Sequence, residues 1–181
     1  MQMAVKARKW TRADLERLPD DGNKYEVIRG ELFVTPPPAA AHESIVEALG
    51  RRIQPFVWAQ KLGQVRFAHS ALGFEKSLAE PDIMVLPPGR VTSWEQMPTP
   101  LLVIEVSSES TVRRDRVAKR SYYMDAGVSE YWIVDGRQRA VTVIKSGEPD
   151  EIVSSGLRWE PSGTTEALHI DLATLFHEAL G

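Results

Sequence analysis

Residues 101–107 read LLVIEVS, and residues 81–87 read PDIMVLP. Each stretch is an apolar strand candidate with a single acid, Glu105 inside the first and Asp82 near the start of the second. An ionised carboxylate is costly to bury unless a cation compensates it, and two carboxylates in neighbouring strands also repel each other. A divalent metal ion would resolve both problems. The two acids are therefore the first candidates for a functional site.

The pattern around these two stretches predicts an α/β fold. The runs IMVL, LLVI and YWIV are apolar at successive positions, as expected for central strands covered on both faces. A strand that is followed by a helix and another strand favours a parallel, right-handed crossover. The expected elements are a short helix from Thr11, a hairpin over 24–35, a helix over 42–61, strands near 64–74, 81–87 and 101–107, a helix over 111–126, strands over 130–135 and 140–145, a strand near 151–159 and a helix near 171–179.

This order of helix, three strands, helix and strand implies a mixed sheet flanked by helices, with an N-terminal hairpin and a C-terminal β extension. At 181 residues, 43% of them hydrophobic, the chain can bury roughly two-thirds of its unfolded surface as one domain over 1–181. There is no cysteine, which excludes disulfides and thiolate chemistry. The N-terminus lacks an apolar signal region and no run approaches 18 apolar residues, so the expected location is the cytoplasm and no membrane is implied.

A lysine on the next predicted helix is placed to meet Glu105. The period of two along LLVIEVS puts Glu105 on one face with Val103 and Ser107. On the helix, Lys119 falls on the same stripe as Tyr122 and Tyr123, whose rings mark that stripe as the side facing the sheet. The ammonium of Lys119 can therefore reach back toward Glu105. Asp82 by itself has a plainer interpretation, as a strand-start residue after a proline.

The ordered set of Pro81-Asp82, Glu105 and Lys119 resembles the PD-(D/E)XK nuclease superfamily, with its restriction-endonuclease-like αβββαβ core. Nearly the whole chain is similar to a large bacterial family of restriction-endonuclease-like proteins, through the stretches YEVIRGEL, PDIMVLP, LLVIEVSSEST, RRDRVAKRSYYMDAGVSEYWIVD and LHIDLATLF. The superfamily has a lysine two residues after the second acid, where this chain has Ser107. The close family has its lysine on the next helix, at the position of Lys119, in agreement with the helical stripe.

The resemblance implies metal-dependent hydrolysis of phosphodiester bonds in nucleic acid. Asp82 and Glu105 would hold Mg²⁺ or Mn²⁺, with the backbone carbonyl of Val106 as a further ligand. Such an ion lowers the pKa of a bound water and neutralises phosphoryl charge, while Lys119 would orient the water or stabilise the developing charge. Glu26 resembles an additional N-terminal acid of the superfamily. Its alternative interpretation is an ordinary exposed glutamate on a strand.

The expected partner is nucleic acid, with DNA as the first candidate. The net charge of −3 provides no global attraction, so binding would use a local basic run that includes Arg113, Arg114 and Arg116. These arginines are also candidate substitutes for Lys119, although a guanidinium does not exchange a proton. His42 could contact a phosphate or a water at the metal. The plainer interpretations are a solvated helix start for the arginines and a helix cap for His42.

Other classes of function remain open at this point. One is a non-catalytic protein that keeps the nuclease fold and binds a partner in a mobile-element or defence system, which Ser107 favours. Another is glycoside cleavage by the acid pair, for which the sequence has no sugar-binding platform. An open pocket beside Asp82, Glu105 and Lys119 would favour the enzyme, whereas a closed salt bridge would favour the binding protein. A homodimer is expected, because a nuclease that cuts both strands of a duplex benefits from two sites.

Overall fold

A six-stranded mixed sheet forms the centre of the molecule. The computed structural model describes residues 9–68, 70–91, 93, 97–108 and 115–181. The strand order is β10-β9-β8-β7-β6-β3, in which β7 and β8 run parallel and the other neighbouring pairs run antiparallel. The strands are β3 (Gln64–Phe67), β6 (Ile83–Leu86), β7 (Leu102–Ser107), β8 (Glu130–Asp135), β9 (Ala140–Lys145) and β10 (Glu151–Val153).

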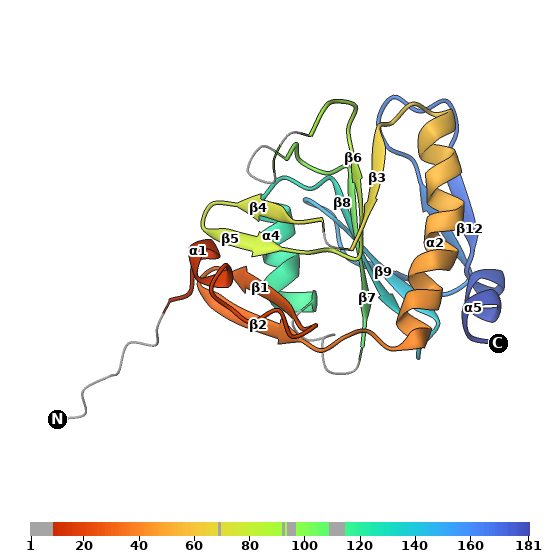
Figure 1. Cartoon of the computed structure of the whole chain (residues 1–181). Helices are drawn as coiled ribbons and strands as arrows, with labels where there is room; N and C mark the ends of the chain where they lie inside the picture. The colour runs from red at the N-terminus through yellow and green to blue at the C-terminus, as the bar shows by residue number, and fades with distance from the viewer. Residues whose placement is uncertain (1–8, 69, 92, 94–96, 109–114) are drawn as a thin grey trace.

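Helices and a second sheet cover the two faces of this central sheet (Figure 1). The helices α2 (Ala40–Ala59) and α5 (Leu172–Leu180) pack on one side. On the other side lie a π-helical turn, η2 (Asp115–Lys119), and the helix α4 (Arg120–Asp125) that continues it. The short helix α1 (Arg12–Leu15) precedes the second sheet. In the described parts of the chain, no helix has the length and apolar character needed to cross a membrane.

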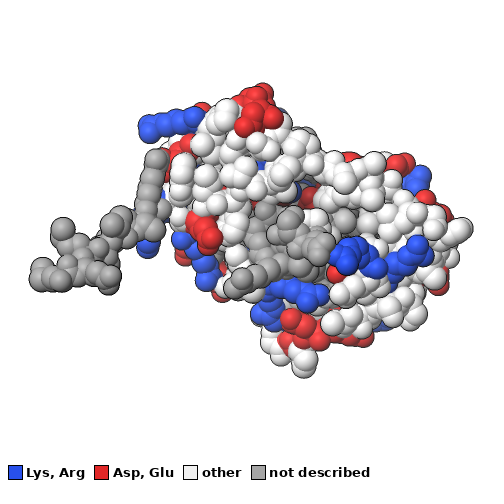
Figure 2. Space-filling view, turned by 90° about the horizontal axis from the view of Figure 1, so that it is seen from below, with Lys and Arg blue, Asp and Glu red and all other residues white. Residues whose placement is uncertain are grey.

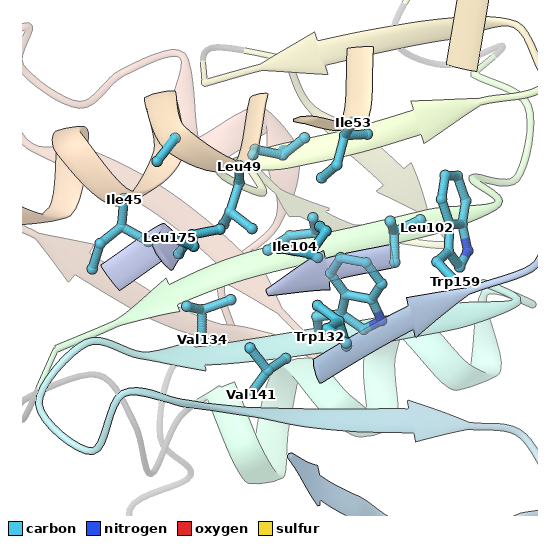
Figure 3. Packing of buried hydrophobic residues seen from close by; sticks show 14 of the residues in the cluster. Ile45, Leu49, Ile53, Leu102, Ile104, Trp132, Val134, Val141, Trp159 and Leu175 are labelled. Carbon is cyan, nitrogen blue, oxygen red and sulfur yellow. The ribbon is translucent and has the colours of Figure 1, made fainter. Parts of the chain in front are cut away.

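Successive side chains of β7 point to opposite faces of the sheet, so the hydrophobic core forms two layers, one on each face. Leu102, Ile104 and Val106 pack with α2 and α5, together with Trp132 of β8 (Figure 3). Val103 points to the opposite face, where it joins the aromatic rings of α4. The predicted assignment of β7 residues to the two faces is therefore confirmed. Glu105 belongs to the α4 face, because it alternates with Ile104.

The second sheet has four strands in the order β2-β1-β5-β4 and corrects one prediction. It contains β1 (Lys24–Ile28), β2 (Glu31–Thr35), β4 (Leu72–Phe74) and β5 (Ser77–Ala79). The expected single strand over 64–74 is in fact β3 and β4, which belong to different sheets. The turn from β4 to β5 passes through Glu75 with φ 54°. Glutamate seldom occupies this left-handed region, so the sequence carried no turn signal there.

The expected strand over 151–159 is also two strands. The first is β10 at the edge of the central sheet, and the second is β11 (Gly156–Trp159), which pairs with β12 (Leu168–Asp171) in a separate two-stranded sheet. In contrast, the predicted hairpin over 24–35 is confirmed, and Ile28 lies opposite Glu31 across its turn. Arg29 and Gly30 both have positive φ, 53° and 87°, as the tight turn between twisted strands requires.

Candidate active site

The pairing of β6 with β7 brings the two acids together. Ile83 lies opposite Ile104, and one further step along this antiparallel register places Asp82 opposite Glu105. Directly opposed residues share a face of the sheet, so both carboxylates point to the same side. Both are also buried, with exposed fractions of 4% for Asp82 and 2% for Glu105. Two acids that lie 23 residues apart in the sequence thus form one pair.

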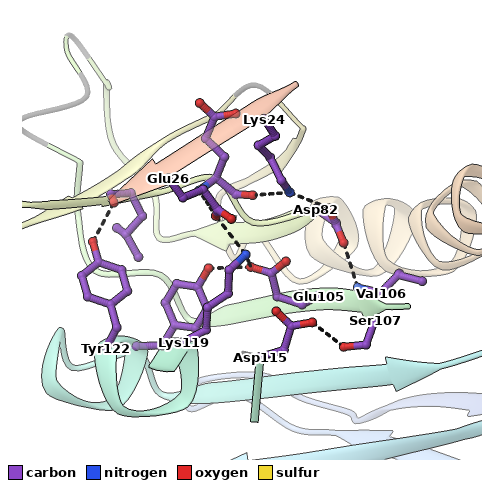
Figure 4. Close-up of polar contacts among 12 residues, drawn as sticks. Lys24, Glu26, Asp82, Glu105, Val106, Ser107, Asp115, Lys119 and Tyr122 are labelled. Carbon is purple, nitrogen blue, oxygen red and sulfur yellow. Dashed lines mark hydrogen bonds and ion pairs between the residues drawn. The ribbon is translucent and has the colours of Figure 1, made fainter. Parts of the chain in front are cut away.

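Lys119 meets this pair from η2, as the helical stripe predicted (Figure 4). Its Nζ lies 2.7 Å from Oε1 of Glu105 and 2.9 Å from Oε1 of Glu26, and its side chain has no exposed surface. Both distances are typical of charge-assisted hydrogen bonds. Lys119 is thus a buried counterion shared by two carboxylates from different sheets.

Glu26 is part of this cluster, and its interpretation as an exposed strand residue is wrong. Its side chain is fully buried, although it comes from β1 of the second sheet. Besides the contact with Lys119, its Oε1 accepts a hydrogen bond from the backbone N–H of Glu80 at 2.9 Å. The hairpin therefore carries Glu26 into the interior between the two sheets.

Glu105 has a raised pKa in this environment. Burial raises the pKa of the Glu105 carboxyl to about 7, while the charge of Lys119 opposes the shift and the charge of Asp82 adds to it. The hydroxyl of Tyr123 donates to the same oxygen, Oε1, at 2.6 Å. Two donors on one oxygen fix the orientation of the carboxylate.

Asp82 has the opposite shift, because cationic groups surround it. Its Oδ2 accepts a hydrogen bond from the Val106 backbone N–H at 2.8 Å and lies 3.5 Å from Nε2 of His42. Its Oδ1 lies 3.3 Å from Nζ of Lys24. Burial opposes the effect, but the contacts with His42 and Lys24 hold the pKa of Asp82 below its ordinary value. Asp82 is therefore ionised at neutral pH. His42 lies beside Asp82, and its contact with a phosphate or a water at the metal stays a prediction.

Three residues of the site, Lys24, Tyr123 and Asp115, were not predicted to belong to it. The sequence does contain a signal for Lys24, because this residue lies two positions before Glu26 and so shares its face of the strand. Tyr123 was placed on the inward stripe but without a role. Asp115 is 1% exposed, and its Oδ2 accepts a hydrogen bond from the Ser107 hydroxyl at 2.6 Å. Ser107, at the usual lysine position of the superfamily, is therefore the partner of a further buried acid.

The predicted basic run is described only in part. Arg113 and Arg114 lie outside the described residues. Arg116 is described, and it is exposed rather than directed at the acid pair. The inward side of η2 is instead occupied by Asp115 and Lys119.

The acid pair opens onto a cavity of about 1110 Å³. Its walls come from the segment before β1, the prolines that follow β2, the first half of α2 and the adjoining ends of β6 and β7. The charged or ionisable residues on its lining include Lys24, His42, Asp82, Glu105 and Asp115. Lys119 is not on the lining, since Glu26 and Glu105 enclose its ammonium. Asp82 and Glu105 therefore line an open pocket, whereas the ion pairs of Lys119 with Glu26 and Glu105 are enclosed beneath its lining.

The donor atoms suit a hard divalent cation. Asp82, Glu105 and Val106 all line the cavity, so two carboxyl groups and a backbone carbonyl are available close to it. Within the described residues, no group of three or more His, Cys, Asp or Glu side chains is arranged to hold a metal ion. Mg²⁺ is commonly held by one or two carboxylates, with water and substrate phosphates completing its shell. Two carboxylates beside an open cavity fit that mode of binding.

Comparison with known proteins agrees with this architecture. The structure is similar to that of a "putative nuclease belonging to DUF820" from Anabaena variabilis ATCC 29413, with a TM-score of 0.79 and 22% sequence identity. The match covers 94% of this chain and 99% of the other, which confirms the predicted α/β fold with a mixed sheet flanked by helices. No curated protein matches the chain. The family model described as "Uma2: Putative restriction endonuclease" matches residues 12–173. The chain therefore belongs to the Uma2 family.

Proposed function

We propose that this protein is a metal-dependent nuclease that hydrolyses phosphodiester bonds of nucleic acid at the Asp82–Glu105 pair. The observation that carries the proposal is the position of the two acids, which are buried side by side and yet lie on the wall of a large cavity. A merely structural ion pair has no need of such a cavity. The family and the fold support the same reaction class.

The charge of the site supports a divalent cation. Four buried carboxylates, those of Glu26, Asp82, Glu105 and Asp115, accompany two ammonium groups, those of Lys24 and Lys119. With all four carboxylates ionised and His42 neutral, these groups carry two net negative charges, which one Mg²⁺ or Mn²⁺ ion would balance. Asp82, Glu105 and the Val106 carbonyl would hold the ion, which would supply Lewis-acid activation of a water and neutralise phosphoryl charge.

The surrounding side chains prepare the acids for this role. Lys119 and Tyr123 both donate to Oε1 of Glu105, so they hold the carboxylate in one orientation at the cavity wall. Glu26 in turn holds Lys119, through the 2.9 Å contact between Oε1 and Nζ. His42 lies beside Asp82 on the cavity lining, where it can orient that carboxylate or contact a substrate phosphate.

Nucleic acid, with DNA as the first candidate, would approach through local positive charge. Basic side chains gather near the centre and right of the face in Figure 2, interspersed with acidic ones. Arg116 is exposed, and Arg113 and Arg114 precede it in sequence. Contacts of this kind to phosphates would give binding that weakens with salt.

The test is a Mn²⁺-dependent nuclease assay on mixed DNA and RNA substrates with the native protein and a Glu105→Gln variant. Gln keeps the size of the side chain but removes the charge that a metal needs. We expect hydrolysis by the native protein only when Mn²⁺ is present, and loss of that hydrolysis in Glu105→Gln.

The matched control is Glu130→Gln. Glu130 is also a buried acid, 6% exposed, but it is not among the residues that line the cavity. Its Oε1 accepts a hydrogen bond from the indole N–H of Trp132 at 2.6 Å. This variant should cleave at the native rate. Equal activity of both variants would show that hydrolysis does not use Glu105, and the absence of Mn²⁺-dependent activity in the native protein would instead support the non-catalytic binding protein. The enclosure of Lys119 is the observation that favours that second candidate.

We also propose that the protein acts as a homodimer. A nuclease that cuts both strands of a duplex benefits from two sites, and β2 and β4 are the outer strands of the second sheet. Light scattering is expected to give about twice the chain mass of 20.3 kDa. A single species at the monomer mass at high protein concentration would contradict the dimer.

A further inference from the structure

Two lysines lie at this site, and their surroundings differ. Lys119 has no exposed side-chain surface, and its Nζ makes contacts of 2.7 and 2.9 Å with Glu105 and Glu26. Lys24 has 22% of its side chain exposed and lies on the lining of the cavity. A substrate that enters the cavity therefore meets Lys24, whereas it can reach Lys119 only if Glu105 or Glu26 moves.

The contacts of Lys24 are also the weaker ones. Its Nζ lies 3.0 Å from the Glu80 carbonyl oxygen and 3.3 Å from Oδ1 of Asp82. The second distance exceeds the 2.7–2.9 Å usual for a charge-assisted bond. An ammonium has three hydrogens, and these two acceptors account for two of them. The group can therefore add an oxygen acceptor, or exchange one, without breaking a short bond.

The position of Lys24 matches the need of the reaction. Its ammonium lies against the carboxylate proposed to hold the metal, on the same cavity wall. The flexible stem of lysine lets the ammonium shift toward a phosphate while β1 stays in place. A cation at that position stabilises the negative charge that grows on phosphoryl oxygens during hydrolysis.

We infer that Lys24, and not Lys119, is the lysine that contacts the scissile phosphate, while Lys119 is a positioning residue that acts through Glu105. This inference rests on the proposed nuclease function and assigns the phosphate contact within it. The superfamily pattern has a single lysine at the site, whereas here two lysines would have separate roles. Lys24 touches the substrate, and Lys119 keeps Glu105 charged and oriented.

The first arm of the test compares Lys24→Met with the native protein in the Mn²⁺ nuclease assay and by calorimetric titration with Mn²⁺. We expect kcat to fall by about 10²-fold or more, as when one donor to a developing oxyanion is removed. Affinity for Mn²⁺ should stay the same or rise, because an ammonium that competes for Asp82 is gone. Lys24→Arg, which keeps the charge, should recover part of the kcat. Lys76→Met, at an exposed lysine next to β5, is the matched control and should behave as the native protein.

A purely structural role for Lys24 gives a different pattern. Thermal stability, Mn²⁺ affinity and kcat would then fall together in Lys24→Met, and Lys24→Arg would restore all three or none. That pattern, or a native kcat in Lys24→Met, would overturn the inference.

The second arm does not depend on turnover. Reductive methylation followed by mass spectrometry measures the accessibility of each lysine in the folded protein. Lys24 should be methylated and Lys119 should not, and a short oligonucleotide with Mn²⁺ should protect Lys24. If the native protein shows no hydrolysis, the nuclease proposal fails, and protection of Lys24 still decides whether it contacts phosphate. Absence of protection at saturating oligonucleotide would refute the assignment in either case.

Discussion

Replacing Lys119 with methionine is expected to lower the free energy of unfolding by about 3–5 kcal/mol, the usual effect of removing one partner from a buried ion pair. The ammonium of Lys119 has no exposed surface and compensates two carboxylates, at 2.7 and 2.9 Å. Methionine fills a similar volume but leaves Glu26 and Glu105 buried without that charge. Urea unfolding followed by circular dichroism measures the loss.

The loss should depend on pH in a defined direction. Burial already raises the pKa of Glu105 to about 7, and removal of Lys119 raises it further. Glu105 ionises near pH 4.3 in the unfolded chain but stays protonated to a higher pH in the folded variant, so the variant loses stability as pH rises above 4.3. The deficit relative to the native protein should therefore be smallest near pH 4–5 and largest above pH 7. A deficit that does not change with pH would show that lost packing, and not charge, is the cause.

Two further variants test whether the loss of stability comes from the buried charges that Lys119 compensates. Lys145→Met removes a lysine whose Nζ lies 3.6 Å from Glu130 but whose side chain is 41% exposed, so it should lower stability by less than about 1 kcal/mol. The double variant Lys119→Met/Glu26→Gln removes one of the uncompensated carboxylates. It should regain part of the stability at neutral pH. If the double variant is less stable than Lys119→Met alone, the description of Lys119 as a shared counterion is wrong.

The second large effect is expected from Asp82→Asn, which should lower Mn²⁺ affinity by about 100-fold or more and remove Mn²⁺-dependent hydrolysis. Changing a partner of a metal ligand already lowers affinity by about 10–100-fold, so loss of a ligand itself should be at least as large. Asparagine keeps an oxygen that can accept the hydrogen bond from the Val106 N–H, which is 2.8 Å from Asp82. The fold should therefore be retained, so a lower Mn²⁺ affinity in calorimetric titration would report the loss of the ligand and not unfolding.

The control for this change is Asp150→Asn. Asp150 is a partly exposed aspartate paired with Arg120 at 2.7 Å on the surface, and it should bind Mn²⁺ as the native protein does. Unchanged Mn²⁺ affinity in Asp82→Asn would exclude Asp82 as a ligand. A fall in affinity of equal size in both variants would point to a general effect of charge.

The sequence by itself determined the central architecture and the main partners of the site. Apolar runs in β6, β7 and β8 indicated buried central strands, and the period of two assigned Glu105 to the face that does not contact α2. Helical periodicity then directed Lys119 at that face. These inferences succeeded because each depends on repeats within one element, which the backbone geometry of strands and helices fixes locally.

The tertiary structure decided the rest, because contacts between elements carry no local signal. The split of 64–74 into β3 and β4 falls between Phe67 and Leu72, and the chain then turns from β4 into β5 through Glu75, a residue type that seldom adopts its left-handed conformation. That split creates the second sheet, and the second sheet brings β1 over the acid pair. Only then does Glu26 become a buried partner of Lys119 and Lys24 a lysine on the cavity wall. The same glutamate would be an ordinary solvated side chain on an isolated hairpin, so its role is set by the packing of the two sheets and not by the sequence around it.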